Sequence, residues 1–166
     1  STSTDSLNYH YRLMTDSNPP TLKGTAIRVS TGEYKEYLLS LYHDTPKEKQ
    51  TDLLNNQINN TAAVQSADGE YCLEADPHED FFHQPIDTTR RKQDYLLPWR
   101  CRIIREVTID IPQGYAVSYL PADFHIETNQ GILSCSYRAG AGYIHFRKVM
   151  EIRRIRIPLA LIPAWN

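Results

Sequence analysis

Apolar and polar side chains alternate with a period of two in several stretches of this chain. The first such stretch covers residues 7–13, where Leu7, Tyr9, Tyr11 and Leu13 are the apolar members. This period is typical of a strand with one buried face. After the turn residues 16–20, which include Pro19 and Pro20, a second alternating stretch covers residues 25–29. The N-terminal part of the chain therefore predicts a β-hairpin with a loose loop.

The period changes to that of a helix after the hairpin, and we expect two short helices. Ser30 and Glu33 have the spacing of a capping box before the first one. The stripe of this helix, which should be buried, consists of Tyr34, Tyr37, Leu38, Leu41 and Tyr42. Thr45 and Glu48 form a second capping box, with Pro46 in the first helical position. The second helix should end near residues 59–60 and carries Leu53, Leu54 and Ile58.

The second half of the chain returns to a period of two. Between residues 61 and 94 the pattern is weak, with one strand candidate at residues 70–74. Next comes either a long strand over residues 99–111 or a strand with an irregularity near Ile104 and Arg105, where the alternation slips by one. Shorter strands are expected at residues 115–119, 124–128 and 132–137. The last strand, residues 143–157, should contain a bulge at Arg153 and Arg154.

These elements predict a mainly β (α+β) fold. We expect an antiparallel β-sandwich or sheet with an N-terminal β-hairpin and a pair of short helices. The 166 residues suit one domain, with the hairpin and helices in 1–60, an irregular connection in 61–94 and the antiparallel β region in 95–166. Because the chain lacks an initiator Met and its last residues, 158–165, are strongly apolar, we interpret it as a fragment of a larger protein.

Charge and hydropathy give no support for two classes of partner, nucleic acids and membranes. The formal net charge is −2 and the pI is near 6.3, so no overall electrostatic reason favours nucleic acid. No apolar run reaches the roughly 18 residues that a membrane span needs. We therefore expect neither nucleic-acid binding nor a membrane-spanning segment.

One segment carries a resemblance to a known family. Residues 107–115 read VTIDIPQGY and are followed by Leu120 and Pro121. The match continues through residues 126–128, Gly131, the strand to Tyr137, the turn at 140–142 and residues 157–158, and upstream through residues 22–24 and 32–34. This pattern resembles a domain of unknown function that follows the transglutaminase-like core in bacterial multidomain proteins common among Bacteroidetes.

The resemblance implies a place in a larger protein. The chain would be a non-catalytic accessory or docking module, and its partner would be the upstream transglutaminase-like core of the same polypeptide. The family's core has a papain-like Cys-His-Asp arrangement, and its proteins resemble exported cell-envelope proteins. By resemblance alone, we expect a periplasmic or cell-surface location.

No residue of this chain stands out as catalytic. The three cysteines are Cys72, Cys101 and Cys135. None opens a predicted helix, the setting that lowers a thiol pKa for nucleophilic chemistry, and none has zinc-site spacing. We predict that the chain is not an enzyme and has no catalytic, cofactor or metal residues. A bridge between Cys101 and Cys135 is left open.

Two charged segments have alternative interpretations. The stretch 76–83 contains Asp76, His78, Glu79, Asp80 and His83, which could hold Zn²⁺ or Ca²⁺ if the loop folded back, but a solvated acidic loop is favoured. A basic series consists of Arg100, Arg102, Arg105, Arg147, Lys148, Arg153, Arg154 and Arg156. For this series we favour a solvated sheet face with the cross-strand partners Glu106, Asp110 and Glu151 over an anion site.

The eleven tyrosines suggest an alternative function. A carbohydrate- or peptide-binding β-sandwich module would present coplanar exposed aromatic rings in a groove. A docking module would instead present a bare apolar patch. Residues 59–61 also form a glycosylation sequon, which matters only in a eukaryotic secretory pathway.

Overall fold

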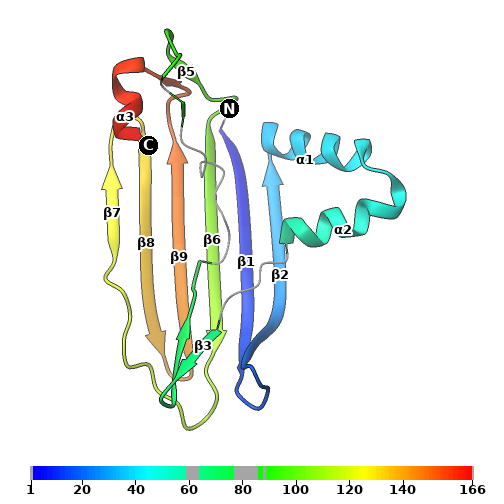
Figure 1. Ribbon diagram of the computed structural model, residues 1–166, viewed down its shortest axis with the longest axis vertical. Helices are drawn as coiled ribbons and strands as arrows, with labels where there is room; N and C mark the ends of the chain where they lie inside the picture. Colours follow the sequence, from blue (N-terminus) through cyan, green and yellow to red (C-terminus); the bar gives the residue numbers. More distant parts are fainter. Residues whose placement is uncertain (1, 59–63, 77–85, 88, 166) are drawn as a thin grey trace.

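The structure is a computed structural model that describes residues 2–58, 64–76, 86–87 and 89–165. Its main element is a six-stranded sheet with the strand order β2-β1-β6-β9-β8-β7 (Figure 1). The strands are β1 (Ser3–Met14), β2 (Thr21–Thr31), β6 (Cys101–Asp110), β7 (Phe124–Glu127), β8 (Gly131–Gly140) and β9 (Tyr143–Ile152). Neighbouring strands are antiparallel, except that β1 and β6 run parallel. The mainly β (α+β) prediction is confirmed, in the form of one mixed sheet.

Smaller elements surround this sheet. A two-stranded hairpin consists of β3 (Val64–Ala67) and β4 (Glu70–Leu73), and a second small sheet pairs β5 (Tyr95–Leu96) with β10 (Arg156–Ile157). The helices are α1 (Glu33–Asp44), α2 (Lys47–Ile58), the 3₁₀ turn η1 (Leu159–Leu161) and α3 (Ile162–Trp165). Figure 1 shows α1 and α2 projecting from the sheet beyond its edge strand β2.

The hydrophobic core lies on one face of the six-stranded sheet, which we call the covered face. One cluster consists of Leu7, Tyr9, Tyr11, Leu13, Val107, Ile109 and Phe146, and Val64, Tyr71 and Leu73 of the β3–β4 hairpin pack against it. A second cluster consists of Leu97, Cys101, Ile103, Ile152, Ile157 and Ile162. Because side chains alternate along a strand, the intervening residues form the opposite, polar face. Among these are Asn8, His10, Glu106, Thr108, His145 and Arg147.

Of the two alternatives for the long strand, the structure has the regular one. In β6 the residues Cys101, Ile103, Arg105, Val107 and Ile109 are all buried, so the alternation is continuous. The apolar pattern of the sequence is interrupted because a charged residue, Arg105, occupies an inward position. A buried charge needs a partner within the core, and that partner comes from another strand.

Two further strand predictions in the C-terminal half differ from the structure. The last strand is shorter than predicted, because β9 ends at Ile152 and β10 pairs with β5 instead. The N–H groups of Arg153 and Arg154 both donate to the Gln130 carbonyl, at 2.8 and 3.4 Å, so two residues lie opposite one at the predicted bulge. Residues 115–119 form no strand. They follow a turn in which the Tyr115 N–H donates to the Pro112 carbonyl at 3.2 Å.

The hairpin β3–β4 was only half predicted. The candidate at residues 70–74 is confirmed as β4, but its partner β3 was missed. Asp68 and Gly69 connect the two strands, and both have positive φ angles, 52° and 81°. An Asp-Gly pair with positive φ at both positions is a preferred two-residue hairpin turn. This pair was the sequence signal for the missed strand.

Both helices are confirmed, but their predicted caps and buried stripe are not. The N-cap of α1 is Gly32, with φ 65° and no side-chain cap bond, while the Ser30 hydroxyl lies in β2 and donates to Asp5. The Thr45 hydroxyl donates back to the Leu41 carbonyl of α1. Of the predicted stripe only Tyr34 is fully buried, and Tyr37 is 47% exposed. The helical period was correct, but the surface that would cover the stripe is missing from the described part of the chain.

Phe146→Ala should destabilise the fold by about 3–5 kcal/mol, because Phe146 is 1% exposed at the centre of the first cluster and its removal leaves a cavity. Chemical denaturation followed by circular dichroism measures this change. Tyr143→Ala, at a 42% exposed position in the same strand, is the matched control and should change stability little. Equal losses in the two variants would contradict the assigned core.

Candidate functional site

A cluster of buried charges lies in the middle of the covered face, and we call it the ionic centre. It consists of Asp5 of β1, Arg28 of β2 and Arg105 of β6, with side-chain exposures of 1%, 7% and 4%. Arg28 donates from Nε to Asp5 Oδ1 at 2.8 Å and from Nη2 to Oδ2 at 3.1 Å. Arg105 Nη2 lies 2.9 Å from Asp5 Oδ2. One carboxylate therefore holds two guanidinium groups from the strands on either side of its own.

Further hydrogen bonds tie the ionic centre to its surroundings, although Arg105 Nε has no hydrogen-bond partner among the described residues. The Ser30 hydroxyl donates to Asp5 Oδ1 at 2.6 Å, and Arg28 Nη2 donates to the Tyr34 hydroxyl oxygen at 2.7 Å. Arg105 Nη1 donates to the backbone carbonyls of Asp5 and Ile104 at 3.3 and 3.1 Å. The Tyr34 bond ties helix α1 to the sheet, which explains why this residue alone of the helical stripe is fully buried.

The electrostatics of the ionic centre favour the charged form of Asp5. Burial raises the pKa of Asp5, but the hydrogen bonds from Arg28 and Ser30 and the positive charges of Arg105 and Arg28 outweigh it, so the pKa lies below its ordinary value. For Tyr34, burial raises the pKa despite the nearby Arg28. The hydroxyl oxygen of Tyr34 therefore stays protonated at neutral pH and accepts the Arg28 bond as a neutral group.

The ionic centre lies in a polar row that separates the two hydrophobic clusters. In the strand register, Arg28 and Arg105 lie on either side of Leu7, and Lys148 of β9 lies opposite Arg105. Lys148 forms an ion pair with Asp76, which follows the β3–β4 hairpin. These groups are enclosed and paired with one another. The arrangement is therefore suited to fixing strand register, and it offers no acid or base to a substrate.

Sequence reasoning missed the ionic centre entirely. Arg105 was placed in the basic series on the sheet surface, and Asp5 and Arg28 were not considered. One signal was present: Asp5 stands two residues before Leu7 and Arg105 two residues before Val107, so each occupies the same face as the apolar residues that follow. Charged residues in phase with an apolar face indicate a buried pair.

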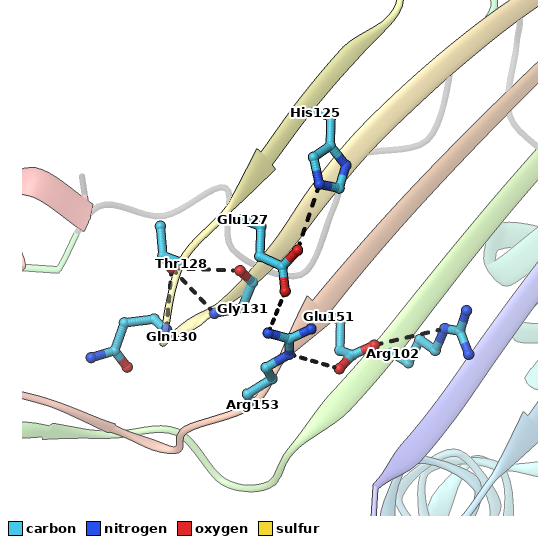
Figure 2. A network of polar contacts seen from close by, with 8 residues as sticks. All are labelled: Arg102, His125, Glu127, Thr128, Gln130, Gly131, Glu151 and Arg153. Atoms are coloured by element: carbon cyan, nitrogen blue, oxygen red, sulfur yellow. Dashed lines mark hydrogen bonds and ion pairs between the residues drawn. The ribbon is translucent and has the colours of Figure 1, made fainter.

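Three members of the basic series, Arg102, Arg147 and Arg153, are paired on the polar face. Figure 2 shows a chain of contacts in which His125 lies 3.8 Å from Glu127, and Arg153 bridges Glu127 at 2.7 Å and Glu151 at 3.2 Å. Arg102 lies 4.0 Å from Glu151, which is one of its predicted partners.

A second set of pairs on the polar face involves the other predicted acidic partners. Arg147 binds Glu106 at 2.9 Å, and Asp110 contacts His10 at 3.0 Å. Because these side chains are substantially exposed, each pair contributes little stability. The predicted solvated face with cross-strand partners therefore agrees with the structure for Arg102 and Arg147.

The cysteines lie in three different settings. Cys101 is buried, and burial together with the negative charge of Asp5 raises its pKa to about 11, so it is a thiol at neutral pH. Cys72 is exposed on β4, and Cys135 is partly buried on β8. Strand β9 separates Cys101 from Cys135. The two strands are about 9–10 Å apart, beyond the roughly 7 Å Cα separation that a disulfide spans.

Only part of the acidic loop candidate can be placed. Asp76 pairs with Lys148, whereas His78, Glu79, Asp80 and His83 lie outside the described residues, as does the sequon at 59–61. Within the described ranges, no group of three His, Cys, Asp or Glu side chains could hold a metal ion. No described helix is long and apolar enough to cross a membrane.

A shallow depression of about 220 Å³ lies where β1 and β6 end. Its lining includes Arg12, Asp16 and Asp110, with Leu13, Met14 and Pro112. Asp110 already contacts His10, and no cysteine contributes to the lining. The depression therefore lacks a paired nucleophile and base.

Large apolar side chains are exposed at several places, and two groups of them lie at the two edges of the six-stranded sheet. On the helix side these are Ile27 (66%) and Val29 (56%) of β2, Tyr37 (47%) and Leu39 (40%) of α1, and Leu54 (46%) of α2. At the opposite edge they are Phe124 (43%) and Ile126 (49%) of β7. Exposed apolar groups of this kind often mark contacts with other protein surfaces.

A family model described as a domain of unknown function with a solved structure (DUF3858) matches residues 70–166. The chain belongs to this family. Comparisons with curated proteins and with solved structures gave no match. The family description names no activity, so the assignment fixes the class of domain and leaves its role open.

The fold extends beyond the DUF3858 match. The match begins at Glu70, the first residue of β4, and so leaves out β1, β2, β3 and both α1 and α2. Yet β1 is an inner strand of the sheet, and it supplies Asp5 together with Leu7 and Tyr9 of the core. The strands of the matched region therefore depend on the segment that precedes it.

A protein restricted to residues 70–166 should fail to form a cooperative fold, because Arg105 would lose Asp5 and β6 would become an exposed edge. Thermal unfolding and dispersion of amide signals in a proton–nitrogen correlation spectrum test this. The full 166-residue chain is the control, and well-dispersed signals from the shorter chain would contradict the dependence.

Asp5→Asn should destabilise the chain by about 3–5 kcal/mol, because two buried guanidinium groups would lose their counter-charge. Denaturant unfolding at neutral pH measures the loss. Asp123→Asn, which removes an exposed pair with Arg138, is the control and should have little effect.

The same ionic centre gives a pH dependence. A lowered pKa in the folded state means that Asp5 contributes its full stability above the ordinary aspartate pKa, about 3.9, and loses that contribution as pH falls through the folded value. The wild type should therefore lose more free energy of unfolding below pH about 4 than Asp5→Asn does. Parallel acid profiles would show that Asp5 is not held ionised by the two arginines.

Proposed function

We propose that this chain is a non-catalytic accessory module that docks against the transglutaminase-like core of a larger cell-envelope protein. The proposal rests on the resemblance of residues 107–158 to the domain that follows such cores, and on the membership of the chain in DUF3858. The observation that carries it is the pair of helices α1 and α2, which project beyond β2 with apolar side chains exposed.

The helix pair has the properties of one side of a protein–protein interface. Each helix has only 12 residues, a length at which isolated helices are marginal in water. Tyr34 is the one fully buried side chain of α1, and Leu39 and Leu54 are 40% and 46% exposed. Helices this short gain most of their stability from packing of an apolar face, so a second protein surface over these residues would stabilise them.

Strand β2 also exposes apolar side chains, on the polar face of the sheet. Ile27 and Val29 are 66% and 56% exposed, although β-branched residues on a strand usually pack against a neighbour. They lie on the strand that leads into α1. We take Ile27, Val29, Tyr37, Leu39 and Leu54 together as the docking surface.

The alternative of a carbohydrate- or peptide-binding module has weaker support. It requires exposed aromatic rings that lie in one plane. Tyr71 and Tyr115 have ring centroids 5.4 Å apart but are tilted by 57°. Tyr119 is 78% exposed, yet a single ring does not make a stacking platform. The docking role is therefore the better explanation of the exposed residues.

The docking proposal predicts saturable binding of this chain to the separately expressed upstream region of its parent protein, with micromolar strength or better. Sedimentation velocity and calorimetric titration measure it. The double variant Leu39→Lys and Leu54→Lys should weaken binding by at least about tenfold, because both residues are exposed parts of the docking surface.

A matched control is the double variant Leu96→Lys and Leu161→Lys. These leucines are 65% and 46% exposed but lie in β5 and η1, away from the helix pair. They should leave the affinity unchanged. No association at high concentration would refute the proposal, and a glycan-array screen would then test the alternative.

A further inference from the structure

The edge strand β7 has an open hydrogen-bonding edge. It is the last strand of the sheet, beyond β8 (Figure 1), and all four of its residues are exposed. Among the described residues, no hydrogen bond joins its outer edge to another segment. Phe124 and Ile126 point to the covered face, and His125 and Glu127 to the polar face.

The register of β7 and β8 shows which backbone groups point outward. The Thr128 N–H donates to the Gly131 carbonyl at 2.9 Å, and Thr128 follows the ladder in which Ile126 pairs with Leu133. In an antiparallel pair, hydrogen-bonded positions alternate with positions that face away. The N–H and C=O groups of His125 and Glu127 therefore point away from β8 and can bind another strand.

The protein protects the neighbouring part of this edge but not β7. Beyond β7, the Tyr137 N–H of β8 donates to Asp123 Oδ1 at 3.0 Å, and Arg138 makes two bonds to the same carboxylate, at 2.8 and 2.6 Å. This carboxylate occupies a place that another strand would otherwise take. Strand β7 itself has no Pro or Lys, the residues that commonly block an edge.

One antiparallel register lets β7 pair with a second copy of itself. If Ile126 lies opposite Ile126 of the second copy, His125 lies opposite Glu127 of that copy, and the reverse pair follows by twofold symmetry. The outward backbone groups of His125 and Glu127 then face each other and complete four hydrogen bonds. In the two alternative registers, the twofold axis passes through His125 or Glu127 instead. These registers would place His125 opposite His125 of the second copy, or Glu127 opposite Glu127.

We infer that β7 is a homodimerisation edge, which joins two copies of this chain into a continuous sheet through the His125–Glu127 register. Two features favour this one register: it completes the hydrogen bonds of the outward backbone groups without placing two Glu127 carboxylates opposite each other, and it places Ile126 against Ile126 of the second copy. The occupant is a second copy because the strand is complementary to itself in both. This inference goes beyond the docking function and uses the opposite edge of the sheet.

Sedimentation velocity of the purified 166-residue chain tests the inference over about two decades of micromolar concentration. The wild type should shift from monomer to dimer as concentration rises. Ile126→Lys should remain monomeric, because it places two like charges opposite each other at the twofold axis. Leu96→Lys, at a 65% exposed position in β5 outside the six-stranded sheet, should dimerise like the wild type.

Charge variants test the register itself. His125→Glu should raise the dimer dissociation constant about tenfold, because each cross-strand pair then holds two carboxylates, whereas His125→Lys should lower it, because each pair then holds an ammonium group and a carboxylate. A wild type that stays monomeric throughout would overturn the inference. So would dimerisation by Ile126→Lys, or equal effects of the two His125 variants. Because no core protein is present, these outcomes are independent of the docking proposal.

Discussion

The pairing of Asp5 with Arg28 and Arg105 is the interaction on which the rest of the sheet depends. Hydrophobic side chains on the covered face would tolerate several strand arrangements, since apolar contacts are not directional. Two buried guanidinium groups are compatible with few strand arrangements, because each group needs a carboxylate within hydrogen-bonding distance. Only a strand placed between β2 and β6, with Asp5 on the covered face, meets both needs.

This requirement explains the one parallel pair of the sheet. Strands β1 and β6 are about 100 residues apart in the sequence, and their parallel pairing places Asp5 beside Arg105. A slip by one residue would turn Asp5 and the core residue Leu7 to the polar face and leave both arginines without a counter-charge. Specificity from buried charge thus complements stability from the two hydrophobic clusters. It also makes the segment before Glu70 part of the same fold as the DUF3858 region.

The surfaces outside this core divide into two kinds. On the polar face, exposed ion pairs such as Arg153 with Glu127 satisfy their charges locally and leave no strong demand for a ligand. The helix pair α1–α2 and the edge strand β7 are different. The helices expose apolar side chains, and β7 exposes both apolar side chains and backbone hydrogen-bonding groups; contact with another protein surface would bury or pair these groups. These are the places where we propose contacts with other chains.

The sequence by itself determined where most strands and helices lie, since periods of two and 3.6 are local properties of the chain. It predicted β1, α1, α2 and β8 with small errors at their ends. It did not determine which face of each strand is buried: in β2, Ile27 and Val29 are exposed while Arg28 is buried. Nor did it reveal that Arg105 continues the buried face of β6. Only the tertiary structure decided these points, because a charged side chain can be buried only where a distant strand supplies its partner, and no local pattern records that partner.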